Sequence, residues 1–312
     1  MRELRTLVAV AERKSMAKAA ADLSLTQPAV TKAIREMEHA LGVRLLDRTP
    51  RGVEPTPYGR ALLKWSEVIL DDLHQAIKEV EFLSDLGAGE LRIGAIQQPV
   101  IQGLLPAILD RVSREYPRIA FHVSYASNTA EAYRQLHERK LDLLVGRLIK
   151  FGSEDNLVME PLFEDPLHVV AGAHNRLTRR RSIQPAELAN EPWILPPPAP
   201  MPDSAVWPYI TEAFRASGLA VPRPSVISNS IPLAVEMITT GRFLAMLPRS
   251  LVWFSGKRLG IKVLPVKELP IRPPPVGIAT LKNRTISPVA NLFIECARSI
   301  ARPLAAVSRR ET

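Results

Sequence analysis

Cysteine is nearly absent from this chain of 312 residues, in which Cys296 is the single instance. One thiol cannot form an internal disulfide, so a secreted scaffold held together by disulfides is excluded. Leu292, Phe293 and Ile300 lie at helical spacing from Cys296, which favours a buried helix position over a reactive thiol.

Long apolar runs are also missing. No segment approaches the ~18 apolar residues that a membrane-spanning helix needs, so we expect no membrane partner. The first ten residues contain Arg2, Glu3 and Arg5 and lack the apolar core of a signal peptide. We therefore expect a cytoplasmic protein.

Signatures of catalysis and of cofactor binding are missing as well. The sequence has no Gly-x-x-x-x-Gly-Lys phosphate loop, no Gly-x-Ser-x-Gly elbow and no HExxH motif, and its histidines show no metal-ligand spacing. Gly87 and Gly89 begin a loose glycine cluster, but they precede the strand expected at 91–96, whereas a dinucleotide-binding loop follows its strand. We expect no enzyme, no cofactor and no metal.

Positive charge is what the chain does have. Its 41 Lys and Arg residues exceed its 32 Asp and Glu residues, which gives a net charge of +9. This balance fits a polyanionic partner, but many basic proteins bind no nucleic acid. The run from Arg179 to Arg181 lies far along the chain from the other basic motif, at 48–56, and is typical of a solvated turn.

The first sixty residues predict short helices followed by a β-ribbon. Ser15 is a good N-cap for a helix over 16–23, after which Ser24 to Thr26 form a tight connection. The next helix begins at Gln27-Pro28, because proline is tolerated in a first turn. Its predicted buried face consists of Val30, Ile34, Met37 and Leu41.

A second face of this helix carries polar and basic groups. Gln27, Thr31 and Arg35 recur at i, i+4 and i+8, and Lys32 lies beside them. Amide, hydroxyl and guanidinium groups in one stripe suit the base edges of a major groove, although an ordinary solvated face has the same pattern. The choice between the two depends on what surrounds the helix.

A basic hairpin at 48–56 follows. It has Gly52 at its turn and carries Arg48 and Arg51. Such a wing would place its cations against the phosphate backbone or in the minor groove. A helix, a short turn, a second helix and a basic hairpin together predict a winged helix-turn-helix that binds double-stranded DNA.

The same region resembles a known family. The segments SMAKAAADL (15–23), TQPAVTKAI (26–34), EME (36–38), LGVRLLDR (41–48) and PTPYG (55–59) are similar to the helix-turn-helix of bacterial LysR-type transcription regulators. Thr31 replaces the usual serine and keeps the hydroxyl, while Met16 and Leu46 replace common phenylalanines. The DNA-binding residues that this resemblance implies are Gln27, Pro28, Thr31, Lys32, Arg35, Arg48 and Arg51.

A long helix is predicted from Tyr58 to about Leu83, because this segment has no proline and only one glycine. A heptad seam runs along it through Ile69, Leu73, Ala76, Val80 and Leu83. Such a helix cannot bury its stripe on a small winged domain, so pairing with a second copy is favoured over packing on its own C-terminal domain.

The LysR resemblance implies the same pairing. It implies a homodimer through the long helix, a homotetramer as a dimer of dimers, and RNA polymerase as a further candidate partner. A twofold dimer should require an inverted-repeat promoter site.

Beyond Glu90, strands and helices alternate, as in a mostly parallel α/β sheet. The expected strands are 91–96, 119–127, 141–145, 168–171, 193–195, 225–228, 243–247 and 276–281. The expected helices are 100–115, 129–139, 204–217, 231–240 and 287–307. A transport solute-binding protein would share this pattern but would lack a DNA-binding module.

The sequence of this part, for example LRIGA at 91–95 and LDLLVG at 141–146, is similar to that of the LysR effector domain. The resemblance implies two lobes of the periplasmic-binding-protein kind. The expected division is a winged helix-turn-helix at 1–59, a linker helix and hinge at 60–89, and an effector domain at 90–312. Lobe I would comprise 90–164 and 267–312, and lobe II would comprise 165–266.

A small-molecule effector is expected at the carboxyl ends of the strands and at helix N-termini. The candidate contacts are Gln97, Gln98, Ser127, Asn128, Arg147, Pro197, Asn229 and Ser230. Asn128 and Ser230 are equally good helix caps. Arg147 could clamp a carboxylate or form a structural ion pair.

The effector class comes from a narrower resemblance. VGRL at 145–148 and WILPP at 193–197 look like the subgroup that contains the galactose-binding-protein regulator and the protocatechuate-pathway activators. This likeness implies a sugar or an aromatic-derived acid.

Overall fold

The computed structural model describes residues 1–50, 52–85, 87–96, 103–126, 128–149, 156–198, 206–267, 269 and 271–308. The chain forms two compact units, residues 1–83 and 84–312. Four predicted site residues lie outside the described residues: Arg51, Gln97, Gln98 and Ser127.

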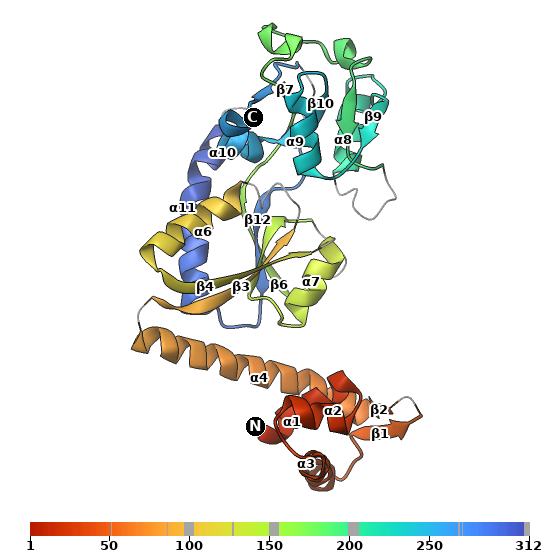
Figure 1. Ribbon diagram of the computed structural model, residues 1–312, viewed down its shortest axis with the longest axis vertical. Coiled ribbons are helices and arrows are strands. Elements are labelled where there is room, and N and C mark those ends of the chain that lie inside the picture. Colours follow the sequence, from red (N-terminus) through yellow and green to blue (C-terminus); the bar gives the residue numbers. More distant parts are fainter. Residues whose placement is uncertain are drawn as a thin grey trace. The chain divides into compact units, whose positions relative to one another are not determined.

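The N-terminal unit is a winged helix-turn-helix, as predicted (Figure 1). It contains α1 (Arg2–Arg13), α2 (Met16–Asp22), α3 (Gln27–Leu41), β1 (Leu46–Thr49), β2 (Gly52–Pro55) and all of α4 (Pro57–Ser84) except its last residue. The two strands pair antiparallel and form the wing. The buried core of this unit consists of Leu7, Val10, Ala19, Ala20, Val30, Ile34, Leu45, Leu46 and Val53.

Side-chain caps define the helices of this unit. The Ser15 hydroxyl accepts a hydrogen bond from the Lys18 N–H at 3.4 Å, and Thr26 does the same for Ala29 at 3.4 Å. α3 ends at Gly42, whose φ of 70° is left-handed. Leu41 is therefore the last helical residue and is 54% exposed, so the prediction that it is buried was wrong.

The PTPYG motif at 55–59 anchors α4 to the segment before the wing. The Thr56 hydroxyl donates to the Arg44 carbonyl at 2.7 Å and accepts the Gly59 N–H at 3.0 Å. The Thr56 N–H donates to the Leu45 carbonyl at 2.9 Å. A Cβ on Gly59 would lie 2.0 Å from that carbonyl oxygen, so only glycine fits here.

Gly59→Ala is therefore expected to destabilise the N-terminal unit by about 3 kcal/mol or more, because the obstructing atom belongs to the backbone and cannot rotate away. Gly42→Ala is the control, since a Cβ there would meet nothing within 4 Å. That change should cost only the left-handed penalty of about 1 kcal/mol. Hydrogen exchange of the amides of residues 1–60 in the full chain measures both. Equal costs would contradict the anchoring role of Gly59.

The C-terminal unit has two lobes, each built on a five-stranded sheet (Figure 1). The lobe I sheet has the order β4 (Arg118–Ala126), β3 (Ala88–Ile96), β5 (Leu143–Arg147), β12 (Val276–Leu281) and β6 (Leu157–Phe163). The lobe II sheet has the order β11 (Ile261–Val263), β7 (Leu167–Gly172), β10 (Leu244–Pro248), β8 (Trp193–Leu195) and β9 (Pro224–Ile227). This is the predicted α/β architecture.

Helices cover both faces of each sheet (Figure 1). Those of lobe I are α6 (Leu104–Glu115), α7 (Thr129–His137) and α11 (Pro288–Ser308). Those of lobe II are α8 (Trp207–Ala216), α9 (Ile231–Thr239) and α10 (Arg249–Leu259), with short turns η1 (Arg176–Arg179) and η2 (Pro185–Leu188). In β10, Leu244 and Met246 face the α8 side, while Ala245 and Leu247 face the α9 side, as strand alternation requires.

One strand in each sheet runs antiparallel to its neighbours, and it is the strand that enters from the other lobe. β7 enters lobe II after β6, and β12 enters lobe I after β11. The start of β7 pairs with the end of β10, and the start of β12 pairs with the end of β5. Both connections therefore join the carboxyl edges of the two sheets, so these edges face each other.

The sequence did not predict three elements. β6 is an edge strand that contains Glu160 and Pro161 and shows no clean alternation of burial. β11 has only three residues. α10 contains Gly256, which lowers helix propensity. β3 also begins at Ala88, three residues before the predicted start at Leu91.

Candidate nucleic-acid interface and effector edge

The polar stripe of α3 faces solvent. Gln27, Lys32 and Arg35 are exposed, and Thr31 is half-buried. Together with Pro28, Glu36 and His39 they line one shallow groove. The structure thus brings five of the seven predicted DNA-binding residues onto one surface.

The groups of this stripe are available for a ligand. The Thr31 hydroxyl donates to the Gln27 carbonyl at 3.0 Å, which leaves its oxygen lone pairs free to accept. Lys32 Nζ lies 3.6 Å from a Glu36 carboxylate oxygen, with side chains 77% and 62% exposed. A pair this exposed contributes little, so Lys32 can turn to a phosphate at small cost.

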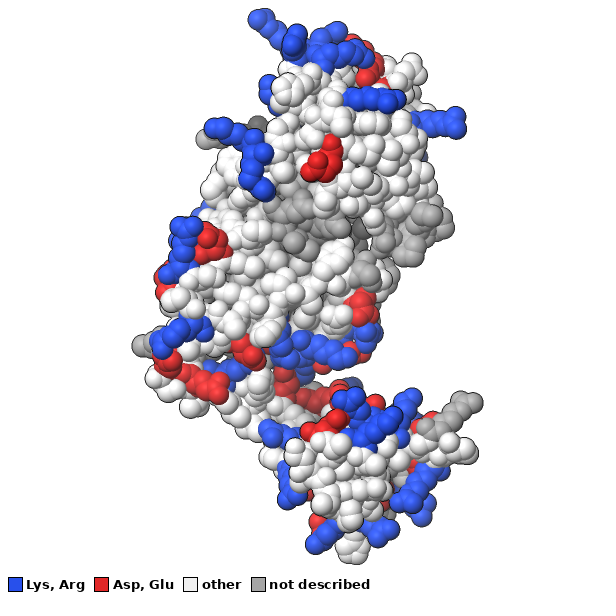
Figure 2. Space-filling view, viewed as in Figure 1, with Lys and Arg blue, Asp and Glu red and all other residues white. Residues whose placement is uncertain are grey.

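The wing is braced against the turn between α1 and α2. The Val53 N–H donates to the Lys14 carbonyl at 3.0 Å, and a Cβ on Gly52 would lie 2.4 Å from the same oxygen. Arg48 lies exposed on β1. Figure 2 shows that Lys and Arg side chains surround the N-terminal unit on the face drawn, with fewer acidic ones between them.

Glu38 connects α3 to the wing, a role that no sequence pattern indicated. One carboxylate oxygen of Glu38 accepts the N–H groups of Leu45 and Leu46, at 2.8 Å and 3.2 Å. These bonds fix the segment that leads from α3 into β1. In the sequence, Glu38 is indistinguishable from a solvated surface charge.

α4 carries a stripe of exposed apolar side chains along the predicted seam. Ile69, Leu73, Val80 and Leu83 are 45%, 37%, 65% and 68% exposed. Large apolar side chains aligned on one helix face are typical of a protein interface. Every helix within the described residues is too short or too polar to cross a lipid bilayer.

The predicted effector residues that are described lie at the carboxyl edges of the two sheets. Asn128 follows β4 in lobe I, and its side-chain oxygen caps α7 by accepting the Glu131 N–H at 2.8 Å. Ser230 caps α9 in lobe II, at 3.4 Å from the Leu233 N–H. Pro197 and Asn229 follow β8 and β9. Contact of these residues with an effector stays a prediction.

Arg147 connects both segments that cross between the lobes. Its guanidinium donates to the carbonyl of Asp165 at 2.8 Å and to the carbonyl of Pro274 at 3.0 Å, and it lies 3.4 Å from the Asp165 carboxylate. Burial lowers the pKa of Arg147, an effect that the Asp165 charge opposes. The structural ion pair is thus present, and a direct effector contact stays a prediction.

Asp165 joins the two lobes, and the sequence did not single it out. Its carboxylate accepts the Ser250 N–H and hydroxyl from lobe II, both at 2.8 Å, while it faces Arg147 of lobe I. Arg249 donates to the Glu164 carbonyl at 2.8 Å and to the Leu304 carbonyl at 3.1 Å. These contacts hold the segment that crosses from lobe I to lobe II against residues of both lobes.

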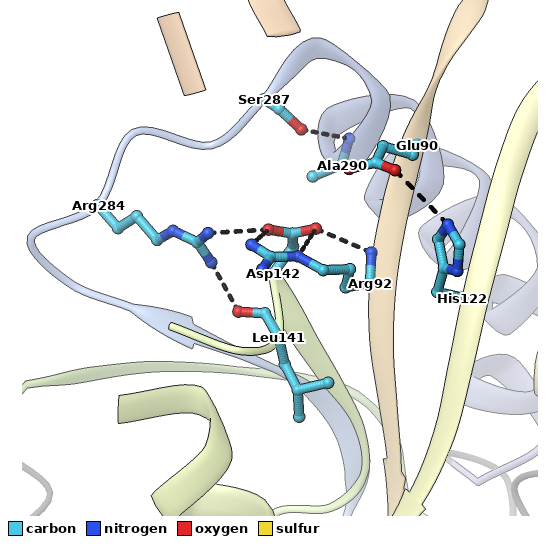
Figure 3. Close-up of polar contacts among 8 residues, drawn as sticks. All are labelled: Glu90, Arg92, His122, Leu141, Asp142, Arg284, Ser287 and Ala290. Carbon is cyan, nitrogen blue, oxygen red and sulfur yellow. Dashed lines mark hydrogen bonds and ion pairs between the residues drawn. The ribbon is translucent and has the colours of Figure 1, made fainter. Parts of the chain in front are cut away.

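Asp142 lies at the other end of β5 from Arg147, just before the strand begins, and several groups of lobe I bind its carboxylate (Figure 3). Its carboxylate accepts the backbone N–H of Arg92 at 2.8 Å and the Arg92 guanidinium at 2.8 Å. The Arg284 guanidinium donates to it at 2.9 Å and to the Leu141 carbonyl at 2.7 Å. One buried carboxylate therefore ties β3, the start of β5 and the loop before α11 together.

Both parts of the chain match known families. Residues 1–60 match the bacterial regulatory helix-turn-helix protein, lysR family, and residues 84–302 match the LysR substrate binding domain. The regulator GbpR of Azospirillum brasilense is 28% identical over 303 residues, which cover 96% of this chain and 86% of that protein. The SDS degradation transcriptional activation protein of a Pseudomonas species is 34% identical over 198 residues, which cover 62% and 63%.

Solved structures show the same fold. A full-length OxyR variant from Pseudomonas aeruginosa has a TM-score of 0.65 and 21% identity, covering 96% of each chain. The LysR family regulator CbnR has a TM-score of 0.55 and 21% identity, covering 95% of this chain and 99% of its own. With the winged helix-turn-helix and the two-lobed domain in place, the chain belongs to the LysR family of DNA-binding transcriptional regulators.

Proposed function

We propose that this LysR-type regulator binds an inverted-repeat promoter site as a homodimer. When a small molecule binds between the lobes, the way in which the protein binds and bends the DNA changes. The observation that carries the proposal is the solvent-facing polar stripe of Gln27, Thr31 and Arg35 on α3, in the same unit as a braced basic wing. A chromosomal target implies work in the cytoplasm, where RNA polymerase would be a further contact.

The stripe and the wing divide the recognition of DNA. Gln27 and Arg35 carry the amide and guanidinium groups that pair with base edges in the major groove. Arg48, and Arg51 by its place in the sequence, contact phosphates, which supply affinity without sequence information.

Gln27→Ala and Arg48→Ala should therefore have different effects on DNA binding. Gln27→Ala is expected to weaken binding to the specific site by about 1–3 kcal/mol while leaving binding to random DNA nearly unchanged. Arg48→Ala should weaken both and reduce the slope of log affinity against log salt by about one. Fluorescence anisotropy with matched duplexes measures these losses. Equal losses on both duplexes for both variants would exclude this division.

The dimer forms along α4, and a homotetramer forms as a dimer of dimers. The exposed seam of Ile69, Leu73, Val80 and Leu83 is the surface that a second copy would cover. The twofold axis of such a pair would place two α3 helices on the two halves of a symmetric site.

The effector is proposed to bind between the facing carboxyl edges and to be a sugar or an aromatic-derived acid. Asn128 comes from lobe I, and Pro197, Asn229 and Ser230 come from lobe II, so a ligand that touches both favours the closed arrangement. Closure would alter the spacing of the DNA-binding pairs and the bend of the DNA.

A panel of sugars and aromatic acids, each added to the DNA-bound protein, tests this coupling. The effective compound should change the length of the DNase footprint, and Asn229→Ala should weaken its binding. A compound that binds the protein tightly but leaves the footprint unchanged would contradict the coupling and leave DNA recognition intact.

A further inference from the structure

A hollow of about 680 Å³ lies at one edge of lobe II. Three arginines, Arg176, Arg223 and Arg242, line it together with polar side chains such as Ser225. The hollow is open and mostly polar, so charge and hydrogen bonds would hold a ligand there.

This hollow is not part of the proposed effector site. Its lining residues at 189–192, 223–225 and 241–242 come just before or at the start of β8, β9 and β10. These three strands are parallel, so their amino ends meet at one edge of the sheet. The proposed effector residues follow the carboxyl ends of β8 and β9, at the opposite edge.

The arginines exceed the acidic groups that could neutralise them. Arg176 pairs with Glu191, the one acidic residue among those that line the hollow. Arg223 has no hydrogen bond or ion pair with any residue that the structure describes. The Arg242 guanidinium lies 5.2 Å from the ring centre of Phe243 and has no carboxylate partner within the described residues.

The surroundings strengthen the positive field. Segments 174–192, 223–225 and 240–243 contain six arginines and two glutamates, an excess of four positive charges. Figure 2 shows Lys and Arg side chains gathered over the end of lobe II that is drawn at the top. An anion that approaches this edge would be attracted before contact.

Asn175, one of the residues that line the hollow, joins two turns at its edge. Asn175 is 4% exposed, and its side chain accepts the Leu177 N–H at 2.9 Å and donates to the Gly241 carbonyl at 2.9 Å. These bonds fix the turn after β7 to the turn before β10, which carries Arg242. A fixed frame lowers the entropy that is lost when guanidinium groups hold a ligand.

We propose that this hollow is a second ligand site, which binds a small molecule through a phosphate group. Guanidinium groups match the geometry of phosphate oxygens with paired hydrogen bonds, and Arg223 and Arg242 have this capacity free of carboxylates. Asn175 and Gly241 hold the frame, and Ser225 adds a hydroxyl. The site gives lobe II an anionic ligand that is separate from the effector between the lobes.

Isothermal titration of the full-length protein with glucose 6-phosphate and with inorganic phosphate, at constant ionic strength, tests the site. Arg223→Ala and Arg242→Ala are each expected to raise the Kd by about tenfold, because each removes a charge-assisted hydrogen bond. Tighter binding of glucose 6-phosphate than of phosphate would identify a phosphorylated metabolite as the source, and equal binding would identify the free ion.

Arg181→Ala is the matched control, because it removes the same charge from an exposed position of lobe II and Arg181 does not line the hollow. Its Kd should stay within about twofold of the wild-type value, since a screened surface charge acts weakly. If Arg181→Ala raised the Kd as much as Arg223→Ala and Arg242→Ala do, the loss of affinity would come from net charge alone. That result would overturn the proposed site. Binding of polyglutamate but of neither phosphate probe would overturn it in favour of an acidic protein partner.

Discussion

Asp142→Ala is expected to destabilise the C-terminal unit by about 3–5 kcal/mol, the usual cost of removing one partner from a buried ion pair. The Asp142 and Arg284 side chains are 5% and 4% exposed, so water cannot replace the lost carboxylate. The substitution would also remove the second ion pair of Asp142, which is with the Arg92 guanidinium, and the acceptor for the Arg92 backbone N–H. β3, β5 and the loop before α11 would be released together (Figure 3).

Asp110→Ala is the control for this substitution. Asp110 also pairs with an arginine, Arg114, but the two side chains are 62% and 80% exposed. Its loss should cost less than about 0.5 kcal/mol. Urea unfolding of the full-length protein, followed by a signal from the C-terminal unit, compares the two. Similar midpoints for both variants would show that the Asp142 cluster does not stabilise lobe I.

A double substitution of the α4 seam, Ile69→Asp with Leu73→Asp, is expected to separate the proposed dimer. Each subunit would bring two carboxylates into an interface that apolar side chains now offer. The carboxylates of the two subunits would then lie close together and away from water. The favourable free energy of dimerisation cannot offset this cost. Affinity for an inverted repeat should fall by about 100-fold. Separate subunits bind the two half-sites independently, whereas in a dimer the binding of one subunit holds the other near its half-site.

The apolar exchange Ile69→Leu with Leu73→Ile keeps the volume and is the control. It should leave the oligomeric state unchanged in analytical ultracentrifugation. If the double aspartate variant stayed dimeric and kept its affinity, α4 would not be the dimer interface. Affinity for a single half-site should stay the same in all forms, which shows that the winged domain remains folded.

The sequence predicted the parts of the fold that depend on local patterns. Ser15, Thr26 and Pro28 define helix starts through caps and a fixed φ, so α2 and α3 were placed within a residue. The alternation of strands and helices predicted an α/β sheet, and the resemblance to the LysR effector domain predicted that it forms two lobes. The missed elements β6 and α10 contain Pro161 and Gly256, and neighbours distant in the sequence stabilise them.

The site was predicted unevenly for a related reason. The α3 stripe is a repeat along one helix, so its members could be found together in the sequence. Asp165 and Arg147 are 18 residues apart, and Asp165 and Ser250 are 85 residues apart. No local pattern marks such partners, and only the two lobe crossings bring them together. The same holds for Asp142 with Arg284 and for the arginines of the lobe II hollow.

In the proposed complex, two subunits place their α3 helices on the two halves of a symmetric duplex. Selection of bound fragments from a random duplex library by the full-length protein tests this arrangement. We expect enrichment of an inverted repeat whose half-sites lie about one helical turn apart, on the same face of the DNA. In the Gln27→Ala variant, the base preference within each half should relax. Recovery of unrelated sequences without dyad symmetry would contradict it.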